Sequence, residues 1–98
     1  MRRAHKTDAN QKTIIDAMRV HGATVHSLAG LAMGLPDLLV GYKGCTILME
    51  VKDGDKNPSK QKLTDYQVTF LSNWTGGPVA VVRDVESALR ILKMVVAQ

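Results

Sequence analysis

The sequence is poor in the residues that build disulfide frameworks, aromatic surfaces and membrane spans. It has 98 residues with a single cysteine, Cys45, and only 4% aromatic residues. One cysteine provides no disulfide and no cysteine-based zinc site within one chain, so we expect a reducing, cytoplasmic setting. No apolar run approaches the roughly 20 residues of a membrane span, and residues 1–6 lack the apolar segment of a signal peptide. We therefore expect a soluble protein that is not exported.

Length and charge limit the function classes further. We expect residues 1–98 to form one domain, because a chain of this size has no room for a separate regulatory domain. Lysine and arginine outnumber aspartate and glutamate by 13 to 9, which gives a formal net charge of +4. This mild basicity permits nucleic-acid binding but does not establish it, since many small basic proteins bind none.

The most informative stretch covers residues 34–52. Two apolar runs, Leu38–Tyr42 and Cys45–Val51, are rich in Val, Ile and Leu and are bounded by turn residues. This pattern predicts two strands of a mostly buried sheet. Lys43 and Gly44, between the runs, predict a two-residue hairpin loop.

Three ionisable residues are set into this apolar pair: Asp37, Glu50 and Lys52. The two-residue period of a strand places Glu50 and Lys52 on the same face. With a two-residue loop, Asp37 stands directly opposite Glu50, with Cβ atoms about 4.5–5.5 Å apart. A loop of odd length would turn the side chains of one strand to the other face. The hairpin register therefore decides whether the three residues gather.

Facing carboxylates repel each other unless a cation lies between them. A hard ion such as Mg²⁺ or Mn²⁺ prefers oxygen ligands and keeps several water molecules. Lys52 could then orient or help deprotonate a water molecule, or neutralise charge that develops on a phosphate. In the alternative interpretation, Asp37 is a turn residue or a cap after Pro36, while Glu50 and Lys52 form an exposed ion pair on a strand.

The spacing of these residues resembles a known nuclease signature. Pro36-Asp37, twelve further residues and then Glu50-Val51-Lys52 resemble the PD-(D/E)xK motif. The surrounding sequence is similar to small stand-alone VRR-NUC (virus-type replication-repair nuclease) domains, from about Thr7 to Leu92. The matching segments are Asp8-Ala-Asn-Gln11, Gly34-Leu-Pro-Asp-Leu-Leu-Val-Gly41, Glu50-Val-Lys-Asp-Gly54 and Leu63-Thr-x-x-Gln67.

The resemblance implies a restriction-endonuclease-like core and a metal-dependent DNA endonuclease that leaves 5′-phosphates. It implies that Asp37, Glu50 and the Val51 backbone carbonyl hold Mg²⁺ or Mn²⁺, and that Lys52 positions the attacking water. Gln11 matches the position of an acidic residue that assists the metal in the family; an amide oxygen is a weaker ligand, and Gln11 could simply cap the first helix.

The resemblance also implies a setting and an assembly. Stand-alone domains of this kind resemble homodimers that act on branched or junction DNA, in phage replication or in repair. A two-fold dimer suits such DNA because it presents two symmetric sites to two strands. The corresponding location is the cytoplasm of a bacterial or phage-infected cell. No motif reads base edges, so we expect structure-selective rather than sequence-specific cleavage.

Gln67 has two predicted roles that compete. Thr64 and Gln67 form a capping-box pattern, which uses the glutamine for backbone hydrogen bonds. The resemblance instead places Gln67 against the active site, holding the water, the lysine or a phosphate oxygen. We expect one side chain to fill both roles only by alternating between them. The helix that follows Thr64 carries apolar residues at helical spacing, which we expect in the core rather than on a base-stacking surface: Tyr66, Phe70, Leu71 and Trp74.

Two basic segments are candidate DNA contacts. Residues 1–6 have nothing apolar to dock, so we expect a flexible basic arm. The polar loop over residues 53–62 follows Lys52 directly and lies where it could touch a sugar-phosphate backbone. Either segment could instead be ordinary solvated chain. The candidate residues are Arg2, Arg3, Lys6, Lys56, Lys60 and Lys62.

The remaining pattern completes the element order of helix, three strands, helix, strand and helix. We expect a first helix capped by Asp8 that ends at about His21, a strand over residues 23–28, a loop whose Gly30 and Gly34 let backbone approach a phosphate, and a strand over residues 78–82. Gly76 and Gly77 should end the helix before that strand. A last helix, capped by Asp84 and running to about Val96, should pack Val85, Leu89, Leu92 and Val96 on the sheet. This order predicts an α/β (α+β) sandwich with a mixed central sheet and helices on both faces.

Two functions from other classes remain open. A non-catalytic nucleic-acid-binding module could keep the nuclease fold, although paired buried carboxylates repel phosphate. A protein that binds only other proteins could use the surplus apolar residues of the last helix, Ile91 and Val95. These two residues could equally form a dimer surface or widen the core.

Overall fold

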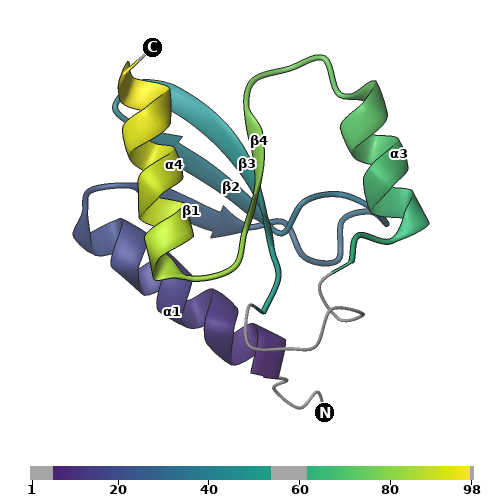
Figure 1. Ribbon diagram of the computed structural model, residues 1–98, viewed down its shortest axis with the longest axis horizontal. Helices are drawn as coiled ribbons and strands as arrows, with labels where there is room; N and C mark the ends of the chain where they lie inside the picture. The colour runs from purple at the N-terminus through teal and green to yellow at the C-terminus, as the bar shows by residue number, and fades with distance from the viewer. Residues whose placement is uncertain (1–5, 54–61, 98) are drawn as a thin grey trace.

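The computed structural model describes residues 6–53 and 62–97, which form a four-stranded sheet and three helices (Figure 1). The basic residues Arg2, Arg3, Lys56 and Lys60 therefore lie outside the described residues. The elements in chain order are α1 (Lys6–Val20), β1 (Thr24–Ser27), β2 (Leu38–Tyr42), β3 (Cys45–Val51), α3 (Asp65–Asn73), β4 (Val79–Val82) and α4 (Val85–Ala97).

The sheet is mixed and follows the order β1-β2-β3-β4. The pairs β1·β2 and β2·β3 are antiparallel, and β3·β4 is parallel. Tyr42 pairs with Cys45 across the two-residue loop, in which Lys43 has φ 48° and Gly44 has φ 85°. Both loop residues thus adopt the left-handed conformation of the tight hairpin turn that matches strand twist. The predicted loop length is confirmed.

One face of the sheet forms the core with α1 and α4. Alternate strand residues point to this face because successive side chains of a strand point to opposite sides. Helices α1 and α4 cover it and contact each other (Figure 1). The buried apolar residues include Ile14, Met18, Val25, Leu38, Val40, Ile47, Met49, Val51, Val82, Ala88, Leu92 and Val95.

The opposite face carries Glu50 and Lys52, and α3 lies on this side, where Gln67 contacts both residues. Coverage there is partial, since Leu39 remains exposed. The arrangement is an α+β fold with a mixed central sheet flanked by helices, as predicted.

Helix α1 begins earlier than the sequence pattern indicated. It starts at Lys6, so Asp8 lies inside the helix, and its expected role as N-cap is wrong. Lys6 likewise belongs to the helix rather than to a flexible arm. Residues 6–8 contain no glycine or proline, so nothing in their chemistry stops the helix there. The predicted stop is confirmed: Gly22 has φ 98° and donates its N–H to the Arg19 carbonyl at 3.0 Å.

Helix α3 differs most from expectation, because none of its residues is buried. Tyr66 is 58% exposed and Trp74 is 42% exposed, so their placement in the core is wrong. Phe70 and Trp74 stack on each other, with ring centroids 5.2 Å apart. The helix ends at Asn73, before the glycine pair that was expected to stop it. Helical spacing identifies an apolar stripe but not whether another element covers it.

The final helix has the predicted N-cap, but the residues that it buries differ from those predicted. Asp84 Oδ1 accepts the Ser87 N–H at 2.8 Å, which is the predicted N-cap contact. The buried residues of α4 are Ala88, Leu92 and Val95, whereas Val96 is exposed and its predicted core position is wrong. Val95 thus widens the core.

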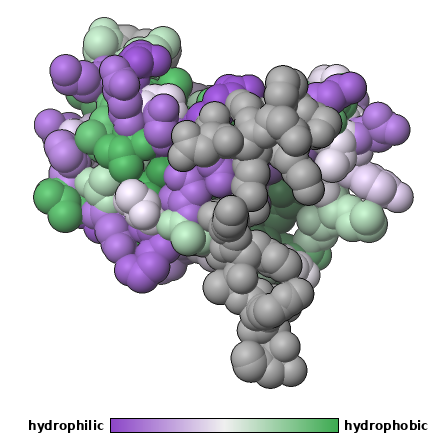
Figure 2. Space-filling model, turned by 60° about the horizontal axis from the view of Figure 1, so that its bottom comes forward, coloured by the Kyte–Doolittle hydropathy of each residue, from purple (hydrophilic) through white to green (hydrophobic). Residues whose placement is uncertain are grey.

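Viewed from the side of α1, the surface mixes hydrophilic residues with smaller apolar areas (Figure 2). Among the described residues, none of the helices has both the length and the apolar character that crossing a membrane requires. Two apolar residues of the loop between β1 and β2 stand out: Leu31 is 70% exposed and Met33 is 73% exposed.

Candidate active site

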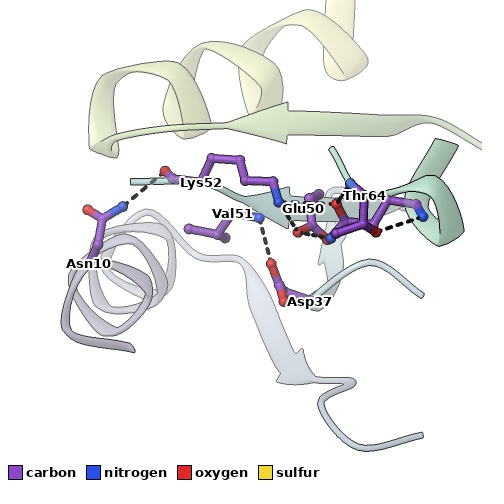
Figure 3. A network of polar contacts seen from close by, with 7 residues as sticks. Asn10, Asp37, Glu50, Val51, Lys52 and Thr64 are labelled. Carbon is purple, nitrogen blue, oxygen red and sulfur yellow. Dashed lines mark hydrogen bonds and ion pairs between the residues drawn. The ribbon is translucent and has the colours of Figure 1, made fainter. Parts of the chain in front are cut away.

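The site forms where β2 begins and β3 ends. Asp37 directly precedes β2, Glu50 is the second-last residue of β3, and Lys52 directly follows β3. Leu38 pairs with Met49, so the same register carried one residue further sets Asp37 opposite Glu50, as predicted. Figure 3 shows the Lys52 side chain turned toward Glu50, and the Asp37 carboxylate turned toward Val51.

Asp37 is held by backbone on both sides. Its Oδ2 atom accepts the Val51 N–H at 2.7 Å, and its own carbonyl accepts the Leu28 N–H at 2.8 Å. The first contact replaces a ladder hydrogen bond at the point where β2 has not yet begun. Asp37 is therefore fixed against β3 and is more than a turn residue after a proline.

Glu50 is a buried acid with an incomplete set of partners. It is 4% exposed, and its Oε1 atom is buried without a hydrogen-bond partner among the described residues. Its Oε2 atom accepts from Gln67 Nε2 at 2.6 Å and lies 3.4 Å from Lys52 Nζ. Burial, followed by the charge of Asp37, raises the pKa of Glu50 from 4.5 to about 7, and Lys52 offsets only part of that rise.

Lys52 is held at both its backbone and its ammonium group. Its N–H donates to the Val82 carbonyl at 2.9 Å, which continues the β3·β4 ladder by one residue. Its Nζ atom donates to Gln67 Oε1 at 3.1 Å, and the side chain is only 11% exposed. A lysine with so little exposure is not the solvated surface ion pair of the alternative interpretation.

Gln67 fills both predicted roles at once, so the expectation that it must alternate is wrong. Its Oε1 atom accepts from the Thr64 N–H at 2.8 Å and from Lys52 Nζ at 3.1 Å, while Nε2 donates to Glu50. The Thr64 hydroxyl accepts the Gln67 N–H in return, which completes the capping box. One amide suffices because its oxygen has two lone pairs and its nitrogen carries two hydrogens.

Asn10 is a residue of this network that the sequence pattern did not reveal. From α1, its Nδ2 atom donates to the Lys52 carbonyl at 3.2 Å (Figure 3) and to the Arg83 carbonyl at 3.3 Å. A signal was present, because Asn10 stands one helical turn before Ile14 on the buried stripe of α1. A polar residue at the head of an apolar stripe indicates a specific hydrogen bond.

The neighbouring Gln11 is half-buried, and its side chain makes no hydrogen bond within the described parts of the chain, so its metal role stays a prediction. Lys62 is exposed just before α3 begins. Lys6 is the first residue of α1. Their DNA contacts, like those of the residues outside the described ranges, stay predictions.

Gly34 allows a close backbone contact between the loop before β2 and α3. It has φ 85°, and a Cβ atom added there would lie 2.5 Å from the Tyr66 carbonyl oxygen. The glycine therefore allows the loop before β2 to touch the first turn of α3, next to Gln67. Its predicted approach to a phosphate is a separate expectation that this contact leaves open.

The residues present fit a hard divalent cation. No group of three or more His, Cys, Asp or Glu residues in the described ranges could hold a metal ion, so Asp37 and Glu50 are the acidic candidates there. The Glu50 Oε1 atom has no hydrogen-bond partner among the described residues, so it can serve as an oxygen ligand of a cation. In an extended strand the N–H and C=O of one residue point to the same edge, so the Val51 carbonyl faces the Asp37 side. Two carboxylates and a carbonyl suit Mg²⁺ or Mn²⁺, which complete their coordination with water.

Comparison with known proteins agrees with this geometry. No protein-family model and no curated protein matches the chain. A solved structure described as a VRR_NUC domain is similar, with a TM-score of 0.68 and 25% sequence identity. The likeness covers 92% of this chain and 97% of that one. Because it extends over nearly all of both chains, in agreement with the motif that gathers at the site, this likeness supports a VRR-NUC domain.

Proposed function

We propose that the protein is a metal-dependent, structure-selective endonuclease that hydrolyses phosphodiester bonds of DNA. The observation that supports this best is the environment of Glu50: a nearly inaccessible carboxyl group with one unpartnered oxygen, facing Asp37 and beside a largely buried lysine. Such an arrangement is costly for a structural role, since buried acids without full hydrogen bonding destabilise a fold. It suits a site that a cation completes.

Asp37, Glu50 and the Val51 carbonyl are the proposed ligands of Mg²⁺ or Mn²⁺. When bound, such an ion polarises a phosphate oxygen and lowers the pKa of a water molecule. Asp37 keeps its place because Val51 N–H holds one of its oxygens, and Glu50 keeps its place because Gln67 Nε2 holds Oε2. Both carboxylates are thus preorganised before any ligand arrives.

Lys52 is the proposed positioning cation for the reacting groups. Its ammonium can donate to the attacking water and to a nonbridging phosphate oxygen, where it neutralises charge in the transition state. Water adds to the phosphorus while the 3′-oxygen leaves, so the products carry a 5′-phosphate and a 3′-hydroxyl. Gln67 Oε1 restrains the ammonium at 3.1 Å, which limits the rotamers of this long side chain.

DNA is the proposed substrate, and branched or junction forms in phage replication or repair are the proposed targets. We propose that the basic side chains within residues 1–6 and 53–62, including Lys62 before α3, contact the sugar-phosphate backbone of the DNA. A homodimer is part of the proposal, supported by the exposed apolar residues Leu31, Met33 and Tyr66. Exposed apolar patches mark interaction surfaces, and a two-fold assembly presents two sites to a branched substrate.

The test is cleavage of labelled single-stranded, duplex, flap and four-way-junction DNA in Mg²⁺, Mn²⁺ or EDTA. Wild type is compared with Lys52→Ala and with Lys12→Ala, a matched control whose side chain is 77% exposed on α1. We expect metal-dependent cutting that Lys52→Ala reduces to a small but measurable residual rate and Lys12→Ala retains. Binding of these DNAs without cutting in either metal would instead support a non-catalytic module.

A further inference from the structure

We infer that Asn10 is a positioning residue for Lys52, acting from α1 through the Lys52 backbone. The inference rests on the proposed function for the catalytic role of Lys52. The contact itself rests only on the geometry around the ends of β3 and β4.

The Asn10 side chain donates hydrogen bonds to two backbone carbonyls just beyond the ends of the parallel strands β3 and β4. The Lys52 N–H to Val82 carbonyl bond, at 2.9 Å, continues the ladder by one residue beyond β3. The Lys52 and Arg83 carbonyls follow directly, and both accept from Asn10 Nδ2, at 3.2 and 3.3 Å. The two hydrogens of one amide nitrogen can serve both acceptors. Asn10 therefore joins α1 to the ends of both strands.

The position of the Asn10 amide is itself fixed by the core. Asn10, Ile14 and Met18 follow one another at four-residue spacing, so they lie on one stripe of α1. Ile14 and Met18 are fully buried at 0% exposure. The helix cannot slide along the sheet without opening this packing.

Lys52 is consequently restrained at three points, each from a different element. Its N–H is held from β4, its carbonyl from α1 and its ammonium from Gln67 of α3. Lys52 lies one residue beyond the end of β3, and Asn10 holds the carbonyl of the peptide group on the far side of its Cα atom. Without the Asn10 hydrogen bond, the Lys52 carbonyl and Cα atom can shift together relative to α1, and a shift of the Cα atom carries the ammonium away from Glu50.

Asn10→Ala should release the Lys52 peptide while leaving the core residues of α1 in place. We expect kcat to fall about 10- to 100-fold with little change in KM, because small misplacements of a reacting group are costly and the DNA contacts are unaltered. Thr13→Ala is the matched control: Thr13 is exposed on the same helix and its hydroxyl bonds only within α1, to the Ala9 carbonyl. This control should keep wild-type kinetics.

A double-mutant cycle separates a role through Lys52 from a general structural role. If Asn10 acts through Lys52, Asn10→Ala should lower kcat no further in a Lys52→Ala background. Equal losses in both backgrounds, or no loss in the folded Asn10→Ala protein, would overturn the inference.

A second readout needs no cleavage and therefore stays informative if the nuclease proposal fails. Reductive methylation followed by peptide mass spectrometry gives the labelling rate of each lysine. We expect Asn10→Ala to raise the Lys52 rate several-fold relative to Lys93, which is exposed on α4, and Thr13→Ala to leave the ratio unchanged. An unchanged ratio in Asn10→Ala would show that Asn10 does not restrain Lys52.

Discussion

The buried carboxyl group of Glu50 couples the fold to pH. Its pKa is raised from 4.5 to about 7 in the native state, first by burial and then by Asp37. Between these two values the native state holds a proton that the unfolded chain has released. Without metal, Glu50 therefore weakens the fold as pH rises from 4.5 toward 7, and the full penalty is present above that range.

Glu50→Gln should remove this pH dependence. In EDTA, we expect wild type to lose about 1–3 kcal/mol of stability relative to Glu50→Gln between roughly pH 5 and pH 8. Urea unfolding at a series of pH values measures the difference. Glu86→Gln is the control, because its side chain is 82% exposed and should show no such trend. A difference between wild type and Glu50→Gln that stays flat with pH would contradict the raised pKa.

Gln67 allows its two roles to be separated by one substitution. Gln67→Glu keeps an acceptor for the Thr64 N–H, so the capping box and the stability of α3 should survive. The same change replaces the Nε2 donor by an oxygen that faces Glu50 Oε2, where 2.6 Å separates the present atoms. We expect cleavage to fall about 10- to 100-fold while α3 keeps its helical content, because the cap contact with Thr64 is retained.

Circular dichroism and urea unfolding check the fold of Gln67→Glu, and single-turnover cleavage checks the chemistry. Gln67→Ala should lose both roles, with cap and activity reduced together. If Gln67→Glu cut DNA at the wild-type rate, the contact with Glu50 would have no part in catalysis.

The sequence predicts those site residues whose side chains are brought to one face of the sheet by the alternation along β2 and β3. Asp37, Glu50 and Lys52 come together because a two-residue loop leaves only one register, and that loop could be recognised from Lys43 and Gly44. Asn10 could not be placed in the same way. Its contacts with Lys52 and Arg83 span 42 and 73 residues of sequence, and they depend on how α1 crosses the sheet.

Helices were predicted less completely than strands, and for a physical reason. Apolar spacing located α3 and α4, but the buried stripe of α4 includes Ala88, a small residue that carries little apolar signal. In α3, Tyr66 and Val68 remain exposed, while Gln67 contacts Glu50 and Lys52. Burial depends on the partner surface, which sequence periodicity does not contain.

The contact between the loop before β2 and α3 can be tested with two glycines of the same loop. Gly34 and Gly30 have nearly equal φ values, 85° and 84°, so alanine suffers the same backbone strain at both. Only at Gly34 would the new Cβ meet backbone, 2.5 Å from the Tyr66 carbonyl oxygen; around Gly30 nothing lies within 4 Å. The difference between the two variants therefore isolates the position of α3.

We expect Gly30→Ala to cost about 1–2 kcal/mol of stability with activity retained, from strain alone. Gly34→Ala should displace α3 and with it Gln67, so that cleavage falls at least about tenfold beyond the Gly30→Ala level. Urea unfolding and single-turnover cleavage give the two quantities. Equal activities in the two variants would mean that the Tyr66 contact does not position Gln67.

Over the whole molecule, metal binding should appear as stability. An ion that binds only the native site stabilises the fold by mass action, by about 2.7 kcal/mol at a hundredfold excess over its Kd. For a domain of this size that corresponds to a melting-temperature rise of roughly 10–20 °C. The carboxylates must be deprotonated to bind, and Glu50 has a pKa of about 7, so the rise should be larger above neutral pH than at about pH 5.5.

Thermal unfolding with and without Mn²⁺, for wild type and Asp37→Ala, measures this effect. Asp37→Ala should lose the metal-dependent rise and yet keep the wild-type oligomeric state in size-exclusion chromatography with light scattering, because the exposed apolar residues of the proposed dimer surface are unaltered. An equal rise in both proteins would place the ion elsewhere. A change of oligomeric state in Asp37→Ala would instead tie assembly to the site, since no other surface group differs between the two proteins.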